Sequence, residues 1–335
     1  MNFKKYPSLT NHYQDKFINF LQINDLTKGE WVAQEKVHGA NFSFHFNGTE
    51  HKQAKRSGFC DENFFNCRAV LKYRASIELM HRYLVDQHVM QKGEPLVVFG
   101  ELFGGKFNKQ KEPNAKTVQG NGADYHPDNE FMAFDIQVNG KFLPFMDVEA
   151  ICNGFKLPLA PIVAYGDFEE MMKLDNEFDS YVPEEFGLER LKNNIAEGLV
   201  IRPYIDERTL DNGSRILIKS KNSKFSEKRG VPTKIDAPLS DNEKALLKSF
   251  SAYFTEARVD ATISKEGQVE NWKQFAKIAG LTFKDAIEDY EKDNFNGMDD
   301  DRTFKSVLGD SYSVFNKHAK FLSDKVVRET FKKLL

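Results

Sequence analysis

The sequence predicts an α+β protein in two parts: a larger first part of antiparallel sheets with flanking helices, and a small all-helical second part. Short runs of β-branched and aromatic residues recur up to about residue 235. Asn-Gly pairs at Asn47, Asn139 and Asn212 stand where tight hairpin turns belong. After Ser240 the apolar residues change to a helical period. Because the strands follow one another through turns, we expect antiparallel sheets and not a doubly wound parallel fold.

The predicted strands come first along the chain. The Asn139-Gly140 turn should join one of them to a partner that begins near Phe142. The strand candidates are residues 31–33, 42–46, 96–99, 131–136, 199–201 and 216–219.

Helices follow a polar segment that contains Gly230 and Pro232. Ser240 and Glu243 form a capping box, and Leu246, Phe250, Tyr253 and Ala257 continue at helical spacing. We expect Gly280 to end a second short helix, residues 282–285 to start another, and a long terminal helix to carry residues 314–328. The predicted division is a first domain over 1–234, a linker over 235–243 and a helical domain over 244–335.

Length and composition exclude several classes of protein. A chain of 335 residues suggests two domains. No stretch approaches the roughly 18 apolar residues of a membrane span, and the first residues lack the apolar run of a signal peptide. Cys60, Cys67 and Cys152 are too widely spaced for a disulfide framework or a zinc cluster, which favours a cytoplasmic location. The net charge of −3 argues against binding nucleic acid over the whole surface, but not against a local basic groove.

One short segment carries the first chemical signal, Glu35-Lys36-Val37-His38-Gly39-Ala40-Asn41. It places an amine at a turn, directly after a predicted strand, where Gly39 permits close backbone approach. A solvated lysine at a strand end would explain this segment taken alone.

Further segments in chain order strengthen the chemical interpretation. Lys55-Arg56 is a basic turn, Glu101 and Phe134-Asp135 lie near the ends of apolar strands, and Glu197 opens another strand. Lys219 and Lys221 lie two residues apart, so they share one face of a strand. Two lysines on one face repel each other unless an anion lies between them, which indicates an anion-binding site.

This ordered set resembles the covalent nucleotidyltransferase superfamily of ATP-dependent DNA ligases, RNA ligases and capping enzymes. His38, where most members have Asp, and Asn41 make the set similar to the RNA ligase 2 family of T-even-type phages and to the kinetoplastid RNA-editing ligases. The segment from Ile218 to Lys228 and the run Lys4-Lys5-Tyr6 resemble the phage branch. A helical tail also fits this branch, since capping enzymes and DNA ligases carry an OB domain there.

The resemblance implies a nucleotidyltransferase domain in the first part and an ATP-dependent polyribonucleotide ligase. Such an enzyme forms a lysyl–AMP intermediate, transfers AMP to an RNA 5′-phosphate, and lets an RNA 3′-OH displace the AMP. The implied cofactors are ATP and Mg²⁺ or Mn²⁺. The implied partner is RNA with 3′-OH and 5′-phosphate ends in nicked duplexes, in RNA repair, with no membrane and no obligatory protein partner. A phage origin would place the protein in the host cytoplasm.

The resemblance also assigns roles to single residues. Lys36 is the expected nucleophile, and nearby cations and desolvation should favour its neutral amine. Glu197 is the expected metal ligand, and Glu101 holds either the ribose or the metal. Phe134 should stack on adenine, and His38 should contact pyrophosphate or the metal or order the loop. The predicted nucleotide contacts are Glu35, Val37, His38, Asn41, Arg56, Glu101, Phe134, Glu197, Lys219 and Lys221. The predicted RNA contacts are Tyr6, Lys55, Asp135, Arg202, Lys224 and Lys228.

Three positions depart from the phage pattern: Gln34 and Tyr165 stand where Arg is found, and Arg202 where Lys is found. We expect these departures to affect RNA contacts and not the reaction class. A basic stripe of seven Lys and Arg against one acid runs from Arg215 to Lys234, which suits phosphate tracking, although a charged hinge would look the same.

Two other motifs are interpreted as decoys. Residues 100–106 nearly spell a P-loop, but Phe107 stands where a metal-binding Ser or Thr is required. Residues 299–301 are three aspartates that we interpret as a solvated loop and helix start. The competing functions are a DNA ligase or capping enzyme, which His38 and the helical tail disfavour, and a non-catalytic single-strand binding module, which gives no reason for Lys36 beside Gly39.

Overall fold

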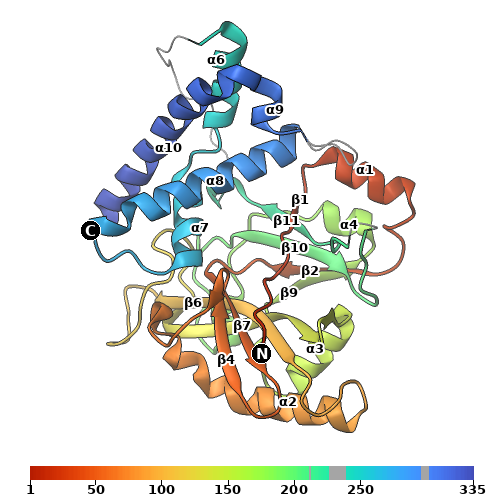
Figure 1. Ribbon diagram of the computed structural model, residues 1–335. Coiled ribbons are helices and arrows are strands. Elements are labelled where there is room, and N and C mark those ends of the chain that lie inside the picture. The colour runs from red at the N-terminus through yellow and green to blue at the C-terminus, as the bar shows by residue number, and fades with distance from the viewer. Residues whose placement is uncertain (211–212, 226–238, 296–301) are drawn as a thin grey trace. The chain divides into compact units, whose positions relative to one another are not determined.

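The computed structural model describes residues 1–210, 213–225, 239–295 and 302–335. The chain divides into two compact units, Met1–Lys224 and Phe225–Leu335 (Figure 1). Asn212 of the predicted Asn212-Gly213 turn and the basic residues of the stripe beyond Phe225 lie outside the described residues, whereas Gly213 is described and has φ 78°.

The first unit contains a five-stranded sheet. Its strands pair antiparallel, except that the first pairs parallel with its neighbour. In sheet order they are β1 (Thr10–Asn11), β11 (Ile218–Lys221), β10 (Gly198–Pro203), β2 (Trp31–Glu35) and β9 (Ile162–Gly166).

A six-stranded antiparallel sheet makes the rest of the framework. Asn139 and Gly140 both have positive φ, 45° and 82°, so the predicted tight hairpin is confirmed. Asn47-Gly48 also lies in a hairpin connection, between β3 and β4. In sheet order the strands are β5 (Gly58–Phe59), β4 (His51–Lys55), β3 (Ala40–Phe46), β6 (Leu96–Lys106), β7 (His126–Val138) and β8 (Lys141–Phe142).

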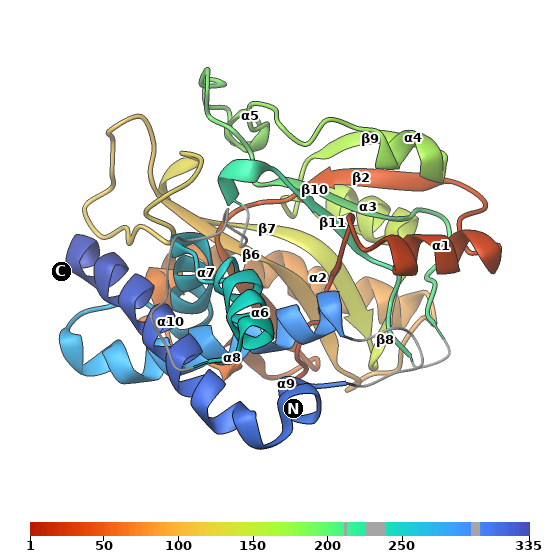
Figure 2. The same cartoon turned by 90° about the horizontal axis from the view of Figure 1, so that it is seen from above.

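Helices cover the outer faces of both sheets. Alternate side chains of β3, β6 and β7 enter one apolar core with η1 (Phe64–Tyr73), α2 (Arg74–Asp86) and α3 (Phe145–Gly154). The five-stranded sheet packs likewise on α1 (Asp15–Ile23) and α4 (Phe168–Met172). The short α5 (Val182–Glu185) lies in the connection before β10. Val97 and Phe99 of β6 pack in a separate apolar cluster with Tyr6 and with Leu217, the residue before β11. Figure 2 shows β2 and β10 of one sheet above β6 and β7 of the other.

The second unit is helical, as predicted. Its main core surrounds Phe250, which contacts the rings of Phe254, Tyr290 and Phe304. The helices are α6 (Asp241–Ser251), α7 (Glu256–Glu266), α8 (Phe275–Asn294), α9 (Phe304–Leu308) and α10 (Tyr312–Leu334), with short turns η3 (Trp272–Gln274) and η4 (Gly309–Ser311). The short turn η2 (Ser223–Phe225) lies at the boundary of the two units.

The helix boundaries confirm some predictions and correct others. Ser240 and Glu243 do form the capping box, so residues 241–243 of the expected linker are helical, and the long terminal helix is present. The helix expected to run through Ala257 is instead two helices, because the Thr255 side chain caps a new one. Gly280 does not end a helix and residues 282–285 do not start one. Both lie inside α8, whose buried face continues past them.

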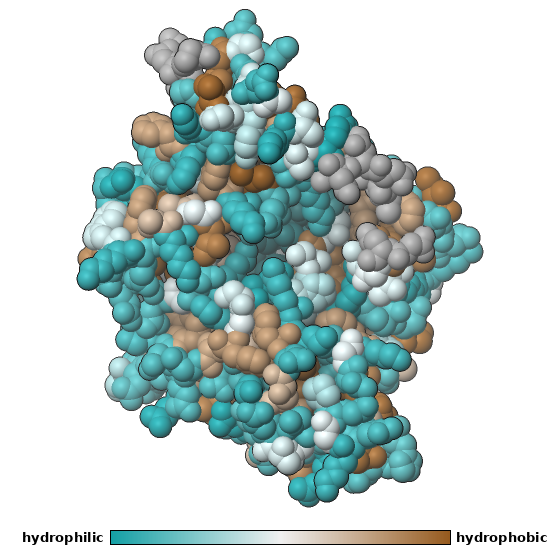
Figure 3. Space-filling view, in the orientation of Figure 1, coloured by the Kyte–Doolittle hydropathy of each residue, from teal (hydrophilic) through white to brown (hydrophobic). Residues whose placement is uncertain are grey.

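Most of the many aromatic side chains are buried and do not reach the surface. On the visible face, apolar side chains are scattered among polar ones (Figure 3). Among the described residues, Phe59 and Phe321 are the phenylalanines with more than a third of their surface exposed, so most of the rings lie in the cores. No helix in the described part of the chain is long and apolar enough to cross a membrane.

Candidate active site

Strand register brings three predicted site residues together on the inner face of the five-stranded sheet. Gly198 pairs with Lys221 on β11, and its carbonyl accepts a hydrogen bond from the Lys36 N–H at 2.8 Å. The ends of β2, β10 and β11 therefore lie side by side. Lys36, Glu197 and Lys221 are 161 and 24 residues apart along the chain but adjacent across this sheet.

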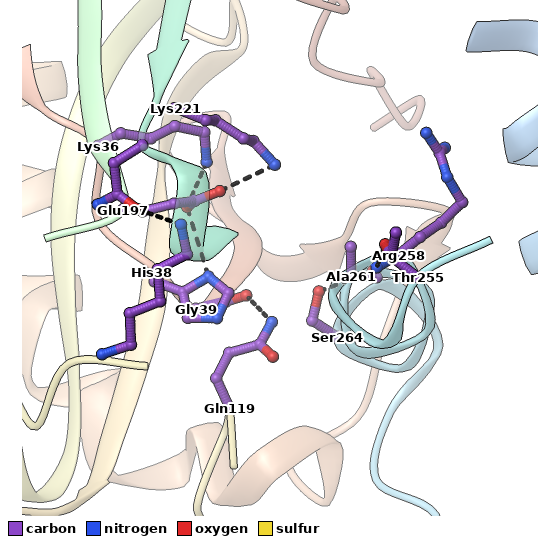
Figure 4. A network of polar contacts seen from close by, with 12 residues as sticks. Lys36, His38, Gly39, Gln119, Glu197, Lys221, Thr255, Arg258, Ala261 and Ser264 are labelled. Atoms are coloured by element: carbon purple, nitrogen blue, oxygen red, sulfur yellow. Dashed lines mark hydrogen bonds and ion pairs between the residues drawn. The ribbon is translucent and has the colours of Figure 1, made fainter. Parts of the chain in front are cut away.

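Glu197 is the centre of the site. Its Oε2 lies 2.6 Å from Lys36 Nζ and 3.4 Å from His38 Nδ1, and its Oε1 lies 3.0 Å from Lys221 Nζ (Figure 4). The side chain is 4% exposed. Burial by itself would raise the pKa of this carboxyl, but Lys221, Lys36 and the His38 hydrogen bond hold its pKa well below the usual range. The carboxylate is therefore an anion throughout the neutral range and holds cationic groups around it.

Two glycines make this close packing possible. Gly198 has φ 138°, and a Cβ there would lie 2.0 Å from the Ser220 carbonyl oxygen. A Cβ on Gly39 would lie 2.2 Å from the Leu102 carbonyl oxygen. The expectation that Gly39 permits close backbone approach is confirmed, and Gly198 has the same role on the other side of Lys36.

Glu101 lies on β6, opposite Asn41 of β3, and its Oε1 accepts a hydrogen bond from the Gly39 N–H at 3.1 Å. Burial raises the pKa of Glu101 to about 8, and Glu197 adds to the rise while Lys36 and Arg56 oppose it. Arg56 also donates to Ser8 Oγ at 3.3 Å. Glu101, Asn41 and Arg56 thus gather beside the turn that follows Lys36.

Phe134 owes its position to a β-bulge. Phe99 pairs with Asp135, but the next residue, Gly100, pairs with Ala133, so Phe134 is the extra residue on β7. A bulge re-aims the side chain at this point, and Phe134 stays partly exposed. It borders the apolar cluster that contains Val37, so an aromatic face and an aliphatic side chain lie on one wall near Lys36.

Of two further predicted nucleotide contacts, Glu35 points its carboxylate away from the site and Lys219 lies on the predicted strand face. Glu35 is 1% exposed and accepts from Ser180 Oγ at 2.6 Å and from the Tyr181 N–H at 2.8 Å, so its carboxylate faces away from the Lys36 side of β2. Lys219 shares its strand face with Lys221, as predicted, in the strand position opposite Val200.

The predicted RNA contacts fall into two groups. Tyr6, Asp135 and Arg202 are all buried: Tyr6 donates to Asp135 at 2.8 Å, and Arg202 lies 3.2 Å from the same carboxylate. Arg215 joins this cluster at 2.5 Å. These side chains are occupied by one another, so this geometry gives no support to their predicted RNA contacts. Lys55 and Lys224 reach the surface at least in part, whereas Lys228 lies outside the described residues.

Sequence reasoning missed three residues that fix the Lys36 turn. Gln119 Nε2 donates to the Gly39 carbonyl at 2.9 Å, the Tyr125 hydroxyl accepts from the His38 N–H at 3.0 Å, and the Asn121 carbonyl lies 3.1 Å from His38 Nε2. All three come from the connection between β6 and β7. No motif marks this connection, and only its spatial neighbours reveal its role.

The carboxylates of the site suit a divalent cation that arrives with phosphate. In the described part of the chain, no three His, Cys, Asp or Glu side chains gather into a metal cage of their own. Mg²⁺ commonly binds through one or two carboxylates together with substrate phosphates. The ionised and nearly buried Glu197 fits that pattern, with Glu101 close enough to influence it.

The decoy motifs and the departures from the phage pattern also have structural outcomes. Residues 100–106 are part of strand β6, so the rejection of a P-loop is confirmed. Residues 299–301 lie outside the described ones.

Two residues that depart from the phage pattern make hydrogen bonds elsewhere. Gln34 Nε2 donates to the Ala160 carbonyl at 3.0 Å, and the Tyr165 hydroxyl donates to Glu149 at 2.8 Å. Neither residue contacts the Lys36 amine.

Comparison with known proteins agrees with this geometry. Residues 29–221, more than half of the chain, match the family model described as RNA ligase, and they contain Lys36, Glu197 and Lys221. The chain belongs to the RNA ligase family. Residues 237–319 match a second model, described as T4 RNA ligase 2 C-terminal. The predicted RNA ligase family membership and the α+β fold with a helical second part are both confirmed.

Relatives in the RNA ligase family are similar over part of their length. The chain is 31% identical to the mitochondrial RNA-editing ligase 1 of Trypanosoma brucei brucei over 251 residues, which is 63% of this chain and 53% of the relative. It is 31% identical to the mitochondrial RNA-editing ligase 2 over 234 residues, or 60% and 55%. The chain thus spans about half the length of the curated relatives it matches.

Among solved structures, an RNA ligase of Naegleria gruberi in an apo mutant form is similar with a TM-score of 0.43 and 14% identity. The match covers 65% of this chain and 55% of that one.

Proposed function

We propose that this member of the RNA ligase family is an ATP-dependent enzyme that joins RNA 3′-OH and 5′-phosphate ends through a lysyl–AMP intermediate at Lys36. One observation carries the proposal: the side chains of Lys36, His38 and Lys221 converge on the buried carboxylate of Glu197 at the ends of adjacent strands. A plain protein core has no need of such a cluster, since removing charges from water is costly.

In the first step the Lys36 amine, after losing a proton to solvent, attacks the α-phosphorus of ATP. An N–P bond forms, the bond from the α-phosphorus to the bridging oxygen breaks, and its electron pair leaves with pyrophosphate. Lys219 and Lys221 provide positive charge beside the α-phosphate, where negative charge develops. Lys36 is well placed for this role, because its backbone is held by β10 and its side chain reaches Glu197.

The nucleoside would lie against the wall made by Phe134 and Val37. An aromatic face stacks on any base, and the bulge at Phe134 exposes part of the ring. Glu101 and Asn41 are then the groups for the ribose hydroxyls, and Arg56 contacts phosphate. Glu35 would contribute through its backbone, because its carboxylate is bonded to Ser180 and Tyr181.

Glu197 would hold Mg²⁺ or Mn²⁺ together with phosphate oxygens. When bound, the cation supplies positive charge beside the phosphate that is transferred. The residues of the chain then orient the reacting groups: Lys36 as nucleophile, and Lys221 and His38 on the two oxygens of Glu197.

The later steps need an RNA surface. We propose a nicked duplex as substrate and RNA repair as role, supported by the resemblance to the phage RNA ligase 2 branch and by the match of residues 237–319. Lys55, Lys224 and Lys228 are the proposed phosphate contacts. We also propose a cytoplasmic site of action, since Cys60, Cys67 and Cys152 are all free thiols.

The test is adenylylation of the purified protein with α-labelled ATP and magnesium. Lys36→Ala should take up no label and keep its fold, because the side chain lies at a turn. Lys36→Arg should fail too, since guanidinium does not deprotonate at usable pH. Lys28→Ala, which removes an exposed lysine paired with Asp25, is the matched control and should label like the wild type. An adduct that survives in the Lys36 variants refutes the assignment.

A joining assay then tests the substrate. We expect sealing of nicked duplex RNA with a 3′-OH and 5′-phosphate, measured beside nicked DNA, hybrids and single strands. A protein that binds RNA but never takes AMP would instead be a non-catalytic binding module.

A further inference from the structure

A buried network of charged groups joins the two sheets of the first unit. Its centre is Asp135 of β7, whose Oδ2 lies 3.2 Å from Arg202 Nη1 and 2.5 Å from Arg215 Nη1. The Tyr6 hydroxyl donates to the same oxygen at 2.8 Å, and Arg215 also donates to Glu207 at 2.6 Å. The side chains of Asp135, Arg202 and Arg215 are 0%, 2% and 4% exposed. The two arginines and the two carboxylates balance in charge, so the network is neutral and almost closed to solvent.

Arg202 also holds the backbone of the residue that we assign to the base. Its Nη1 donates to the Phe134 carbonyl at 3.1 Å, while its Nη2 donates to Asp135 at 3.3 Å and to Glu207 at 3.4 Å. The extra residue of a β-bulge is left out of the regular ladder, so Arg202 gives this carbonyl a partner from the other sheet. A planar guanidinium can serve several acceptors in fixed directions, which an ammonium does less well.

The ring of Phe134 contacts the same network. The ring centroids of Tyr6 and Phe134 are 4.9 Å apart at an interplanar angle of 62°, an edge-on contact. The Tyr6 hydroxyl is bonded to Asp135, so the network fixes the ring of Phe134 as well as its carbonyl. Part of the Phe134 side chain nevertheless stays exposed, which leaves it available to a base.

Arg202 ties this aromatic wall to the strands that carry the reacting groups. It lies on β10, five residues after Glu197, and pairs with Val32 of β2, the strand that leads to Lys36. Phe134 belongs to β7 of the other sheet (Figure 2). The contact from Arg202 to Phe134 therefore relates the place of the base to the place of the amine. Phosphoryl transfer depends on such placement, since a small displacement of bound groups slows the reaction.

Stability alone explains the network less well. Apolar residues of similar volume often replace a buried ionic network without loss of stability, so burying these charges is weak evidence of a stabilising role. Burial raises the pKa of Asp135, but Arg202 and Arg215 outweigh burial and hold its pKa below the usual range. The carboxylate is therefore ionised at neutral pH, and its hydrogen bonds keep one fixed arrangement.

We propose that Arg202 is a positioning residue for self-adenylylation: together with Asp135 and Tyr6 it fixes Phe134, and so determines where the base of ATP lies relative to Lys36. These three residues then serve the nucleotide step and not RNA contact. The inference rests on the proposed function of Lys36 and on Phe134 as the base contact.

The experiment measures ATP binding apart from the chemistry. In full-length protein that carries Lys36→Ala, ATP cannot form the adduct, so its dissociation constant is obtained by equilibrium titration with magnesium. Adding Arg202→Met should raise this constant about tenfold, within the range for loss of one base–aromatic stack. When Phe134→Leu is also present there is no ring to position, and the same Arg202 substitution should change the constant by less than about twofold.

Arg208→Met is the matched control. Arg208 also pairs with a carboxylate, Asp206 at 2.8 Å, and donates to a backbone carbonyl, that of Leu26, at 2.9 Å. Both partners lie outside the Phe134 network, so this substitution should lower the melting temperature and leave the dissociation constant for ATP unchanged. Arg202→Lys keeps the positive charge and should restore part of the affinity, and it takes the place of a Met variant that folds poorly.

Two results would overturn the inference. An equal change of the dissociation constant with and without Phe134→Leu would mean that Arg202 does not act through the ring. Unchanged ATP binding together with weaker binding of nicked RNA would mean that Arg202 contacts RNA instead. A protein with native Lys36 that binds ATP but takes up no AMP refutes the proposed function, whereas the dissociation constants still decide the role of Arg202.

Discussion

At the scale of single residues, Glu197 explains most of the site. Three groups share its two oxygens, and removing the carboxylate leaves Lys36 and Lys221 facing each other without an anion between them. Their repulsion would displace both side chains, and the metal site would lose its ionised ligand.

We therefore predict that Glu197→Ala lowers both self-adenylylation and joining by at least about 10²-fold, the scale of losing one preorganised electrostatic group. Rates are measured separately with ATP and with 5′-adenylylated RNA. Glu78→Ala, which removes a half-exposed carboxylate bonded to His51, serves as the control. Near-normal joining by the Glu197 variant at ordinary magnesium would show that the carboxylate is not needed.

The buried carboxyl of Glu35 should make the free energy of unfolding depend on pH. Burial raises its pKa to about 7 from 4.5, partly offset by the hydrogen bonds from Ser180 and Tyr181. A carboxyl whose pKa is higher in the folded state stabilises the fold fully below pH 4.5, and this contribution is lost as the pH rises through 7. The difference corresponds to roughly 3 kcal/mol.

Glu35→Gln removes this titration. We expect the free energy of unfolding of the variant, measured by denaturant titration at several pH values, to vary less between pH 4.5 and 7 than that of the wild type. The comparison concerns the slope with pH, because the amide introduced by the substitution also changes the hydrogen bonds to Ser180 and Tyr181. Parallel curves for the two proteins would contradict the raised pKa.

At the scale of elements, the register of β2, β10 and β11 assembles the site, and Gly198 permits it. Its φ of 138° and the 2.0 Å approach of a Cβ to the Ser220 carbonyl leave no room for a side chain. Gly198→Ala should push β10 from β11 and separate Glu197 from Lys221. We predict a loss of stability of at least about 1 kcal/mol and a larger proportional loss of adenylylation. Gly187→Ala, at positive φ but with open space around it, tests the strain alone.

Arg258 has the corresponding structural role in the second unit. It is 1% exposed on α7, donates to Asp285, and contacts Asp289 at 2.9 Å (Figure 4 shows Arg258 beside Thr255). Removing one partner of a buried ion pair costs about 3–5 kcal/mol, so Arg258→Met should strongly destabilise the helices. Lys284→Met, which breaks only an exposed pair with Glu288, should change stability by about 0.5 kcal/mol or less. Thermal unfolding compares the two variants.

Local chemistry made many elements predictable. Three local signals predicted structure that the fold contains: the Asn139-Gly140 turn, the Ser240 capping box, and the alternation that places Lys219 and Lys221 on one strand face. The helix ends near Gly280 were not predictable in this way. A glycine with open space around it is tolerated inside α8, because the packing of the helix on its neighbours outweighs the weak local signal.

The site residues also fall into those that local sequence predicts and those that it does not. Lys36, Glu101, Glu197 and Lys221 follow from motifs, whereas Gln119 and Tyr125 do not, because their role depends on where a loop without a motif lies in space. Tyr6, Asp135 and Arg202 carry charge and polarity typical of a surface, yet they pair with one another inside the unit. A sequence does not reveal such internal pairing, since the partners are 67 and 129 residues apart.

In the whole molecule, the first unit contains every proposed nucleotide contact, and the second unit contains none. Each unit has a core of its own. Removing residues from 240 onward should therefore leave self-adenylylation nearly intact and largely abolish joining of 5′-phosphate RNA ends. Both activities are measured on the truncated protein and on the full chain.

A second truncation, after Lys224, serves as the control for the basic residues 228, 229 and 234, which the longer fragment keeps. If those residues contribute to RNA binding, the longer fragment should bind nicked RNA more tightly at low salt, and the difference should disappear as salt rises. A 1–239 fragment that seals nicks as well as the full chain would show that the helical unit does not hold the substrate. A fragment that no longer reacts with ATP would mean that the helices are required for the nucleotide pocket, and the assignment of the whole first step to residues 1–224 would be wrong.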